Sequence, residues 1–144
     1  MIQRVLIRKT TYSALVGLAK KYAPRITCGL LIGKRIGDVV HVDEIYPLPT
    51  FTGPKIHFKP SWSAYRSALN DIHEEKKTKV GEFHTHPDGT EELNLNDKRI
   101  LRSLGSGLWI IATPSTVVPW HFCVQRYKEH FPTESFSQVS MELV

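Results

Sequence analysis

The sequence predicts a single α/β or α+β domain, in which helices pack on a central mixed β-sheet. Segments with the apolar spacing of a helix alternate along the chain with short apolar runs typical of buried strands. Glycine and proline residues separate these segments. With 144 residues, 41% of them hydrophobic, the chain is long enough to bury one core, and a second domain is not expected.

Three segments have apolar residues at helical spacing, and each is bounded by residues that start or stop helices. They are residues 11–22, 61–75 and 95–104. The first is stopped by Pro24, and the second begins near Ser61. The third has Asn94 or Asn96 as a possible N-cap and is followed by glycine. We therefore expect three helices, all with one apolar face.

Strands are expected at residues 2–7, 26–32, 39–46, 80–85, 108–112 and 117–125. Residues 26–32 form a continuous apolar run, typical of a strand buried on both faces, and residues 34–38 are expected to turn. The proline-rich residues 47–54 are expected to form a loop. The polar segment 127–144 shows no clear period, so we predict a domain over residues 1–126 and leave the tail unassigned.

Composition limits the possible partners and compartments. The net charge of +5 permits an acidic partner, but the basic residues are scattered, so there is no specific nucleic-acid signal. The one cluster, Lys76, Lys77 and Lys79, is expected to be a solvated helix end. Cys28 and Cys123 lie in apolar stretches where free thiols are usual. The apolar runs are too short to span a membrane and the start lacks a signal peptide, so we expect a cytoplasmic protein.

Residues 80–97, VGEFHTHPDGTEELNLND, contain the most informative pattern. Because strand side chains alternate, Glu82, His84 and His86 should share one face of the strand. Asp97 falls in the first turn of the next helix, so a strand end and a helix start can converge. Two imidazoles and a carboxylate are ligands that catalytic Zn²⁺ takes. We predict a zinc site at His84, His86 and Asp97, against the alternative that the histidines are ordinary polar residues at a strand end.

Other metal and nucleophile chemistries fit the sequence less well. The zincin string H-E-x-x-H is absent, because Lys77 stands where its second histidine should be. Neither cysteine has the partner that a zinc deaminase requires. The GKRIGD segment lacks the leading glycine and the hydroxyl residue of a phosphate loop. His121 lies near Cys123 in sequence, but nothing else indicates a cysteine nucleophile.

The string GEFHTHP, followed by Asn94 and Asp97, resembles the JAMM signature, in which H-x-H-P is followed by a serine and then an aspartate. That family is also called JAB or MPN, and the similarity is to its prokaryotic JAB type. The string TCGLLIG at residues 27–33 looks like the family's second strand. The resemblance covers roughly residues 3–125. It implies a single JAB-like domain, similar in layout to the cytidine deaminases.

The family contains zinc metallopeptidases that cleave peptide or isopeptide bonds next to ubiquitin and its relatives. The resemblance therefore implies Zn²⁺ held by His84, His86 and Asp97, and a protein or peptide substrate that carries a ubiquitin-like tail. Two positions depart from the pattern. Asn94 stands where the family has an oxyanion-stabilising serine, and an amide can also donate that hydrogen bond, although an N-cap role explains Asn94 equally well. Ile26 stands where the family has the glutamate that acts as general base.

An isoleucine cannot accept a proton, and a general base typically contributes roughly 10²–10⁴-fold to the rate. Glu82 is a possible substitute, although two residues along a strand span about 7 Å. Glu44, Glu91 and Glu92 are further candidates. Two functions remain open: a JAMM-type zinc peptidase or isopeptidase, and a metal-binding scaffold or peptide-binding module that has lost turnover through Ile26. The sequence does not fix the substrate, the oligomeric state or the role of the tail.

Overall fold

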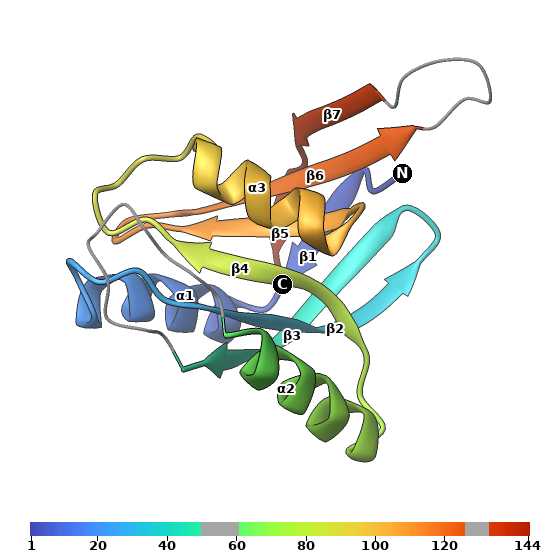
Figure 1. The fold of residues 1–144 in the computed structure, drawn as a ribbon, viewed down its shortest axis with the longest axis horizontal. Helices are drawn as coiled ribbons and strands as arrows, with labels where there is room; N and C mark the ends of the chain where they lie inside the picture. Colours follow the sequence, from blue (N-terminus) through green and yellow to red (C-terminus); the bar gives the residue numbers. More distant parts are fainter. Residues whose placement is uncertain (50–60, 126–132) are drawn as a thin grey trace.

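The computed structural model describes residues 1–49, 61–125 and 133–144. Within these residues, eight strands form one mixed sheet in the order β7-β6-β5-β4-β2-β3-β1-β8 (Figure 1). The strands are β1 (Arg4–Ile7), β2 (Cys28–Ile36), β3 (Val39–Leu48), β4 (Lys79–Thr85), β5 (Gly107–Ala112), β6 (Val117–Gln125), β7 (Thr133–Gln138) and β8 (Ser140–Leu143). The helices are α1 (Lys9–Lys21), α2 (Trp62–Glu74) and α3 (Leu95–Leu104). The predicted α+β class with a central mixed sheet is confirmed.

The sheet separates two apolar cores. On one face, α1 packs through Leu15 against residues such as Leu31, Phe83 and Ile110. On the other face, α2 and α3 cover a second core, which includes Leu30, Ala68, Ile72, Leu101, Trp109 and Ile111. Figure 1 shows α2 and α3 together in front of the central strands, with α1 behind them. Because the middle of the sheet is covered on both faces, β5 and the first half of β2 are nearly continuous apolar runs, whereas β4 also buries the polar residues Glu82, His84 and Thr85.

Strand β4 lies near the middle of the sheet, antiparallel to β2 and parallel to β5. Cys28 of β2 lies opposite His84, and Ile111 of β5 lies on its other side. The backbone N–H of His86 donates to the carbonyl of Ala112, which continues the pairing with β5 just beyond the end of β4. The last residues of β4 are therefore fixed from both sides before the chain leaves the sheet toward α3.

The hairpin between β2 and β3 differs from the prediction. The turn expected over residues 34–38 is confined to Gly37 and Asp38, and β2 continues to Ile36. Gly37 has a φ of +62°, which suits glycine at the first position of a two-residue hairpin turn. At Gly33 the register with β3 shifts, and a Cβ there would stand 1.8 Å from the His41 carbonyl oxygen. Pairing between β2 and β3 therefore continues through the polar residues that the sequence analysis expected to form part of the turn.

The C-terminal segment, which the sequence leaves unassigned, extends the sheet at both edges. Strand β7 pairs antiparallel with β6, and Phe136 stacks on Phe122 with ring centroids 4.9 Å apart. Strand β8 pairs in parallel with β1 at the opposite edge, and the intervening Val139 is buried in the core that α1 covers. Residues 133–144 therefore belong to the same sheet as the rest of the domain.

The remaining predictions concern the end of β3, the lysine cluster and membrane-spanning segments. β3 extends two residues further than expected, to Leu48, while the rest of the predicted proline-rich loop lies largely outside the described residues. Lys79 is not part of a solvated helix end. It begins β4 and is half-buried, whereas Lys77 pairs with Glu44 and Glu75 at the surface. Among the described residues, no helix is long and apolar enough to cross a membrane.

Candidate metal centre

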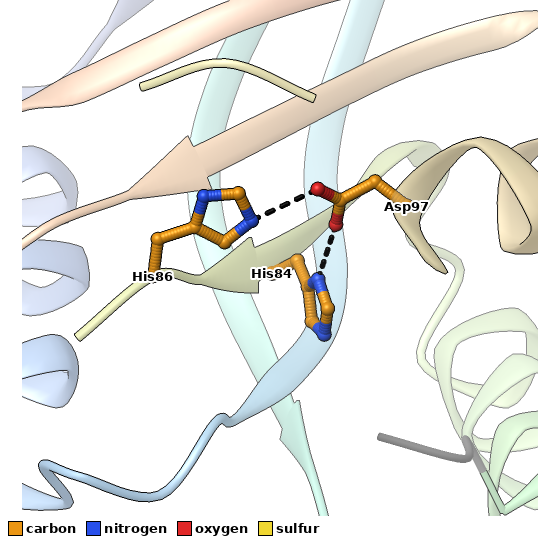
Figure 2. Close-up of side chains that lie close together, drawn as sticks. All are labelled: His84, His86 and Asp97. Atoms are coloured by element: carbon orange, nitrogen blue, oxygen red, sulfur yellow. Dashed lines mark hydrogen bonds and ion pairs between the residues drawn. The ribbon is translucent and has the colours of Figure 1, made fainter. Parts of the chain in front are cut away.

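His84, His86 and Asp97 converge at the end of β4, as the sequence predicts. Figure 2 shows the two imidazoles and the carboxylate directed toward one another, the histidines from β4 and the segment just after it and the aspartate from α3. One candidate ligand atom from each residue lies within 4.8 Å of the other two. The exposed fractions are 0% for His84, 2% for His86 and 0% for Asp97. Three titratable side chains are thus held together out of solvent.

The Asp97 carboxylate lies between the two imidazoles. His84 Nδ1 is 2.5 Å from Oδ1, and His86 Nε2 is 2.9 Å from Oδ2. Burial alone would raise the pKa of Asp97, but the hydrogen bonds from both histidines lower it well below its usual range. Burial lowers the pKa of His86, and its hydrogen bond with Asp97 outweighs this and raises that pKa. A proton or another cation is therefore favoured between His86 Nε2 and the carboxylate.

The start of α3 orients the Asp97 carboxylate through a capping box. The Asn94 side chain accepts a hydrogen bond from the Asp97 backbone N–H at 2.8 Å, and Asp97 Oδ2 accepts from the Asn94 backbone N–H at 2.9 Å. The N-cap role considered for Asn94 is thus confirmed. The helix dipole also favours a carboxylate in the first turn. One local motif therefore begins the helix and fixes a candidate ligand.

A short loop after β4 fixes His86. The Thr90 carbonyl oxygen lies 2.8 Å from His86 Nδ1, so this nitrogen donates and leaves Nε2 directed toward Asp97. The Asp88 side chain accepts hydrogen bonds from both the backbone N–H and the hydroxyl of Thr90. The Trp120 indole N–H donates to the Glu91 carbonyl at 3.1 Å, which ties the loop to β6. Metal-binding histidines usually have such a partner on their second nitrogen.

A pocket of about 620 Å³ opens beside the centre. His86 and Asn94 line it, together with Asp88, Thr90 and Asn96 and the apolar residues Ala23, Pro24, Ile26, Pro87 and Leu95. Neither His84 nor Asp97 lines this pocket. Ile26, half-buried just before β2, thus stands in the wall of the cavity that reaches His86. The position matched to the family's general base faces the candidate site but carries an aliphatic side chain.

Glu82 occupies a separate polar cluster on β4. It is 7% exposed, and its Oε1 accepts hydrogen bonds from Lys79 Nζ at 2.6 Å and from the Tyr65 hydroxyl at 2.8 Å. It lines a different and much smaller hollow, of about 20 Å³, together with Trp62 and Trp109. A catalytic role for Glu82 stays a prediction, and its ion pair favours a structural role. Glu44 pairs with Lys77, while Glu91 and Glu92 are exposed.

The donor set fits a divalent metal. His84, His86 and Asp97 provide two imidazole nitrogens and a carboxylate, the ligand types of three-residue catalytic zinc sites. Both imidazoles already face the same carboxylate, so a cation could replace the protons between them. Thr90 and the Asn94 backbone provide the supporting hydrogen bonds to His86 and Asp97.

Sequence reasoning missed the residues that hold this set in place. Thr90 acts through its backbone carbonyl, Asp88 through its side chain on Thr90, and Trp120 from the distant strand β6, and the sequence analysis linked none of them to the site. The capping box was the one supporting feature with a local signal, because asparagine followed three residues later by an acidic residue is typical of a helix start.

Comparisons with known proteins agree with this fold. The family model described as prokaryotic homologs of the JAB domain matches residues 8–124. The solution structure of protein DSY2949 from Desulfitobacterium hafniense is similar, with a TM-score of 0.77 and 24% sequence identity over 97% of this chain and 92% of that chain. That likeness concerns the fold alone. A search of curated proteins found no match. On the family match, which spans β2, β4 and the candidate centre, the chain belongs to the prokaryotic JAB domain family.

Proposed function

We propose that this protein is a zinc-binding, JAMM-type metallopeptidase or isopeptidase-like hydrolase that acts on a peptide or isopeptide bond near a ubiquitin-like tail. The observation that carries the proposal is the buried convergence of His84, His86 and Asp97 beside a pocket that reaches His86. Three protein ligands leave room for a fourth at a catalytic zinc ion. Membership of the JAB family supports the same class of chemistry.

The residues of this chain would have the following roles in this function. His84, His86 and Asp97 would hold the zinc ion, which when bound would polarise a carbonyl and activate water. The Thr90 carbonyl accepts a hydrogen bond from His86 Nδ1, so Nε2 is the nitrogen that would bind the metal. Asn94 uses its side-chain oxygen in the helix cap, so its amide hydrogens are the groups left to donate to a substrate carbonyl in the pocket.

A second candidate function rests on the same pocket. Ile26 lines it where the family has a proton acceptor, and Glu82 is held by Lys79 and Tyr65 in a separate hollow. These positions favour a metal-binding scaffold or peptide-binding module with impaired turnover. The two proposals share the metal and differ only in hydrolysis, so they can be tested in sequence.

Metal analysis is the first test. Purified protein should contain about one equivalent of zinc, and the His86→Ala and Asp97→Ala variants should lose it. His121→Ala is a matched control, because His121 is another buried histidine on a strand but lies outside the cluster. Protein without stoichiometric zinc after incubation with the ion would refute both proposals.

Hydrolysis of a ubiquitin-like fusion, with and without chelator, is the second test. Chelator-sensitive cleavage by the wild-type protein supports the hydrolase, and loss of cleavage in Glu82→Gln would identify Glu82 as the base. Zinc binding without cleavage, together with cleavage gained in Ile26→Glu, supports the impaired scaffold. Zinc binding with no cleavage by either protein would remove the hydrolase proposal for this substrate class.

A further inference from the structure

The pocket beside His86 has an uneven wall that bears on what it binds. Five of the ten described residues that line it are apolar, and they come from two separate places in the chain: Ala23, Pro24 and Ile26 before β2, and Pro87 and Leu95 around the β4–α3 connection. The polar residues His86 and Asn94 belong to the candidate centre and to the helix cap beside it. The cavity therefore joins an apolar wall to the candidate metal centre.

Leu95 is the clearest sign that the apolar wall is incomplete in the free protein. It is the first residue of α3 and is 73% exposed, the highest exposure among the large hydrophobic residues in the described part of the chain. Burial of a leucine side chain is favourable, so leaving one exposed at the rim of a cavity favours a ligand that covers it. Ile26 is half-buried in the same cavity and presents further aliphatic surface.

Charge narrows the choice of ligand. Among the described residues that line the pocket, Asp88 is the one that is charged at neutral pH unless His86 takes up a proton, and none of those away from the centre is basic. An acidic side chain would find no cation there and would lose hydration. The volume of about 620 Å³ exceeds a single side chain and falls within the usual range for ligand pockets.

We propose that this pocket is a specificity site that accepts a bulky apolar side chain, such as leucine or phenylalanine, from a peptide segment placed beside His86. Ile26 and Leu95 are then the residues that determine specificity, and acidic residues are rejected. The inference rests on the proposed function for the view that the ligand is a peptide. In this chain, Ile26 would contribute apolar contact at the position where the family has a charged group.

Peptide binding should be measured apart from cleavage, so that the proposed specificity site and the proposed function can fail independently. The probes are octapeptides identical except for one central residue: leucine, phenylalanine, serine or aspartate. They are titrated into ¹⁵N-labelled full-length protein in the presence of chelator, and amide shifts report both affinity and location. The leucine and phenylalanine peptides should bind about 10-fold more tightly than the serine peptide, with the largest shifts at Ile26, Thr90 and Leu95. The aspartate peptide should bind most weakly.

Two variants make the test specific. Leu95→Ser changes an exposed side chain and should reduce the preference for leucine over serine several-fold without affecting the fold. Ile36→Ser is the matched control, because Ile36 is a 60% exposed aliphatic residue on the β2–β3 hairpin that does not line the pocket. It should leave the preference unchanged. Equal affinities across the peptide series, shifts confined to another surface, or an equal effect of the two variants would overturn the inference, whatever the zinc and cleavage assays show.

Discussion

Strand β4 carries two buried polar clusters that differ in how their charges are balanced. In the middle of the strand, the Glu82 carboxylate has a permanent cation, Lys79, and a hydroxyl donor, Tyr65. At the end of the strand, the Asp97 carboxylate is bonded to His84, His86 and the Asn94 backbone N–H, and no lysine or arginine among the described residues pairs with it. Lysine remains charged at neutral pH, whereas an imidazole becomes a cation only by taking a proton. The first cluster is electrostatically complete, and the second depends on an added cation.

This difference separates a structural ion pair from a candidate ligand site. A buried carboxylate that already has lysine gains little from a metal, and the 20 Å³ hollow beside Glu82 leaves little space for a ligand. The Asp97 carboxylate instead has two imidazoles beside it, which can be neutral, and a large pocket lies next to His86. The presence of a buried acidic group is therefore not enough to locate a site. The type of partner that each group has is more informative.

The largest expected effect is on zinc affinity. Asp97→Ala removes one of three ligands and should lower the affinity by more than about 100-fold, since loss of a mere supporting partner typically costs 10–100-fold. Isothermal titration with zinc measures this effect. Glu82→Gln, a change at another buried carboxylate, on β4, is the matched control and should keep wild-type affinity. Comparable losses in both variants would break the distinction between the two clusters.

Zinc should also stabilise the folded protein, because a ligand that binds only the native state shifts the unfolding equilibrium. At a free zinc concentration of 100 times the dissociation constant, the stabilisation is about 2.7 kcal/mol, or roughly 8 °C in Tm for a domain of this size. Thermal unfolding with and without chelator measures the shift. The Asp97→Ala variant should show no shift, while a full shift in that variant would place the metal elsewhere.

Loss of the Glu82 cluster should affect stability rather than metal binding. In Glu82→Ala, Lys79 loses its partner while half-buried, with its side chain 32% exposed. Breaking a fully buried pair costs about 3–5 kcal/mol, and the partial exposure of Lys79 lowers the expected cost to about 2 kcal/mol. Urea denaturation in chelator measures it. Lys79→Met, which removes the cation and leaves Glu82 buried, should be at least as destabilising, and stability equal to wild type in both variants would contradict a structural role.

The sequence was sufficient for the parts of the fold and site that depend on local pattern. The apolar periods predicted the helices and central strands, and the H-x-H string with Asp97 predicted which side chains converge. The convergence could be predicted because the end of the strand and the start of the next helix are joined by only a short loop. The same reasoning explains why the capping box could be anticipated.

Long-range contacts set the limit of that reasoning. In strand β7, Phe136 is the residue that stacks on an aromatic ring of β6, and the sequence of β7 alternates too little between apolar and polar residues to indicate a strand. The strand becomes evident only from its pairing with β6. The hydrogen bond that Glu82 accepts from Tyr65 comes from α2, and the hydrogen bond from Trp120 to the Glu91 carbonyl comes from β6. None of these partners has a fixed spacing in the sequence. The role of Glu82 therefore could not be judged from its position on the strand alone.

The smallest expected effect concerns the capping box, which links helix stability to the metal centre. Asn94→Ala removes the acceptor for the Asp97 N–H and should cost about 1 kcal/mol in urea denaturation with chelator present. Asn94→Ser restores a capping oxygen and should recover most of that loss. Zinc affinity should fall less than about 10-fold in Asn94→Ala, because the backbone N–H of residue 94 still donates to Asp97. A loss as large as that of Asp97→Ala would show that the cap, and not only the three ligands, determines whether the second cluster binds a cation.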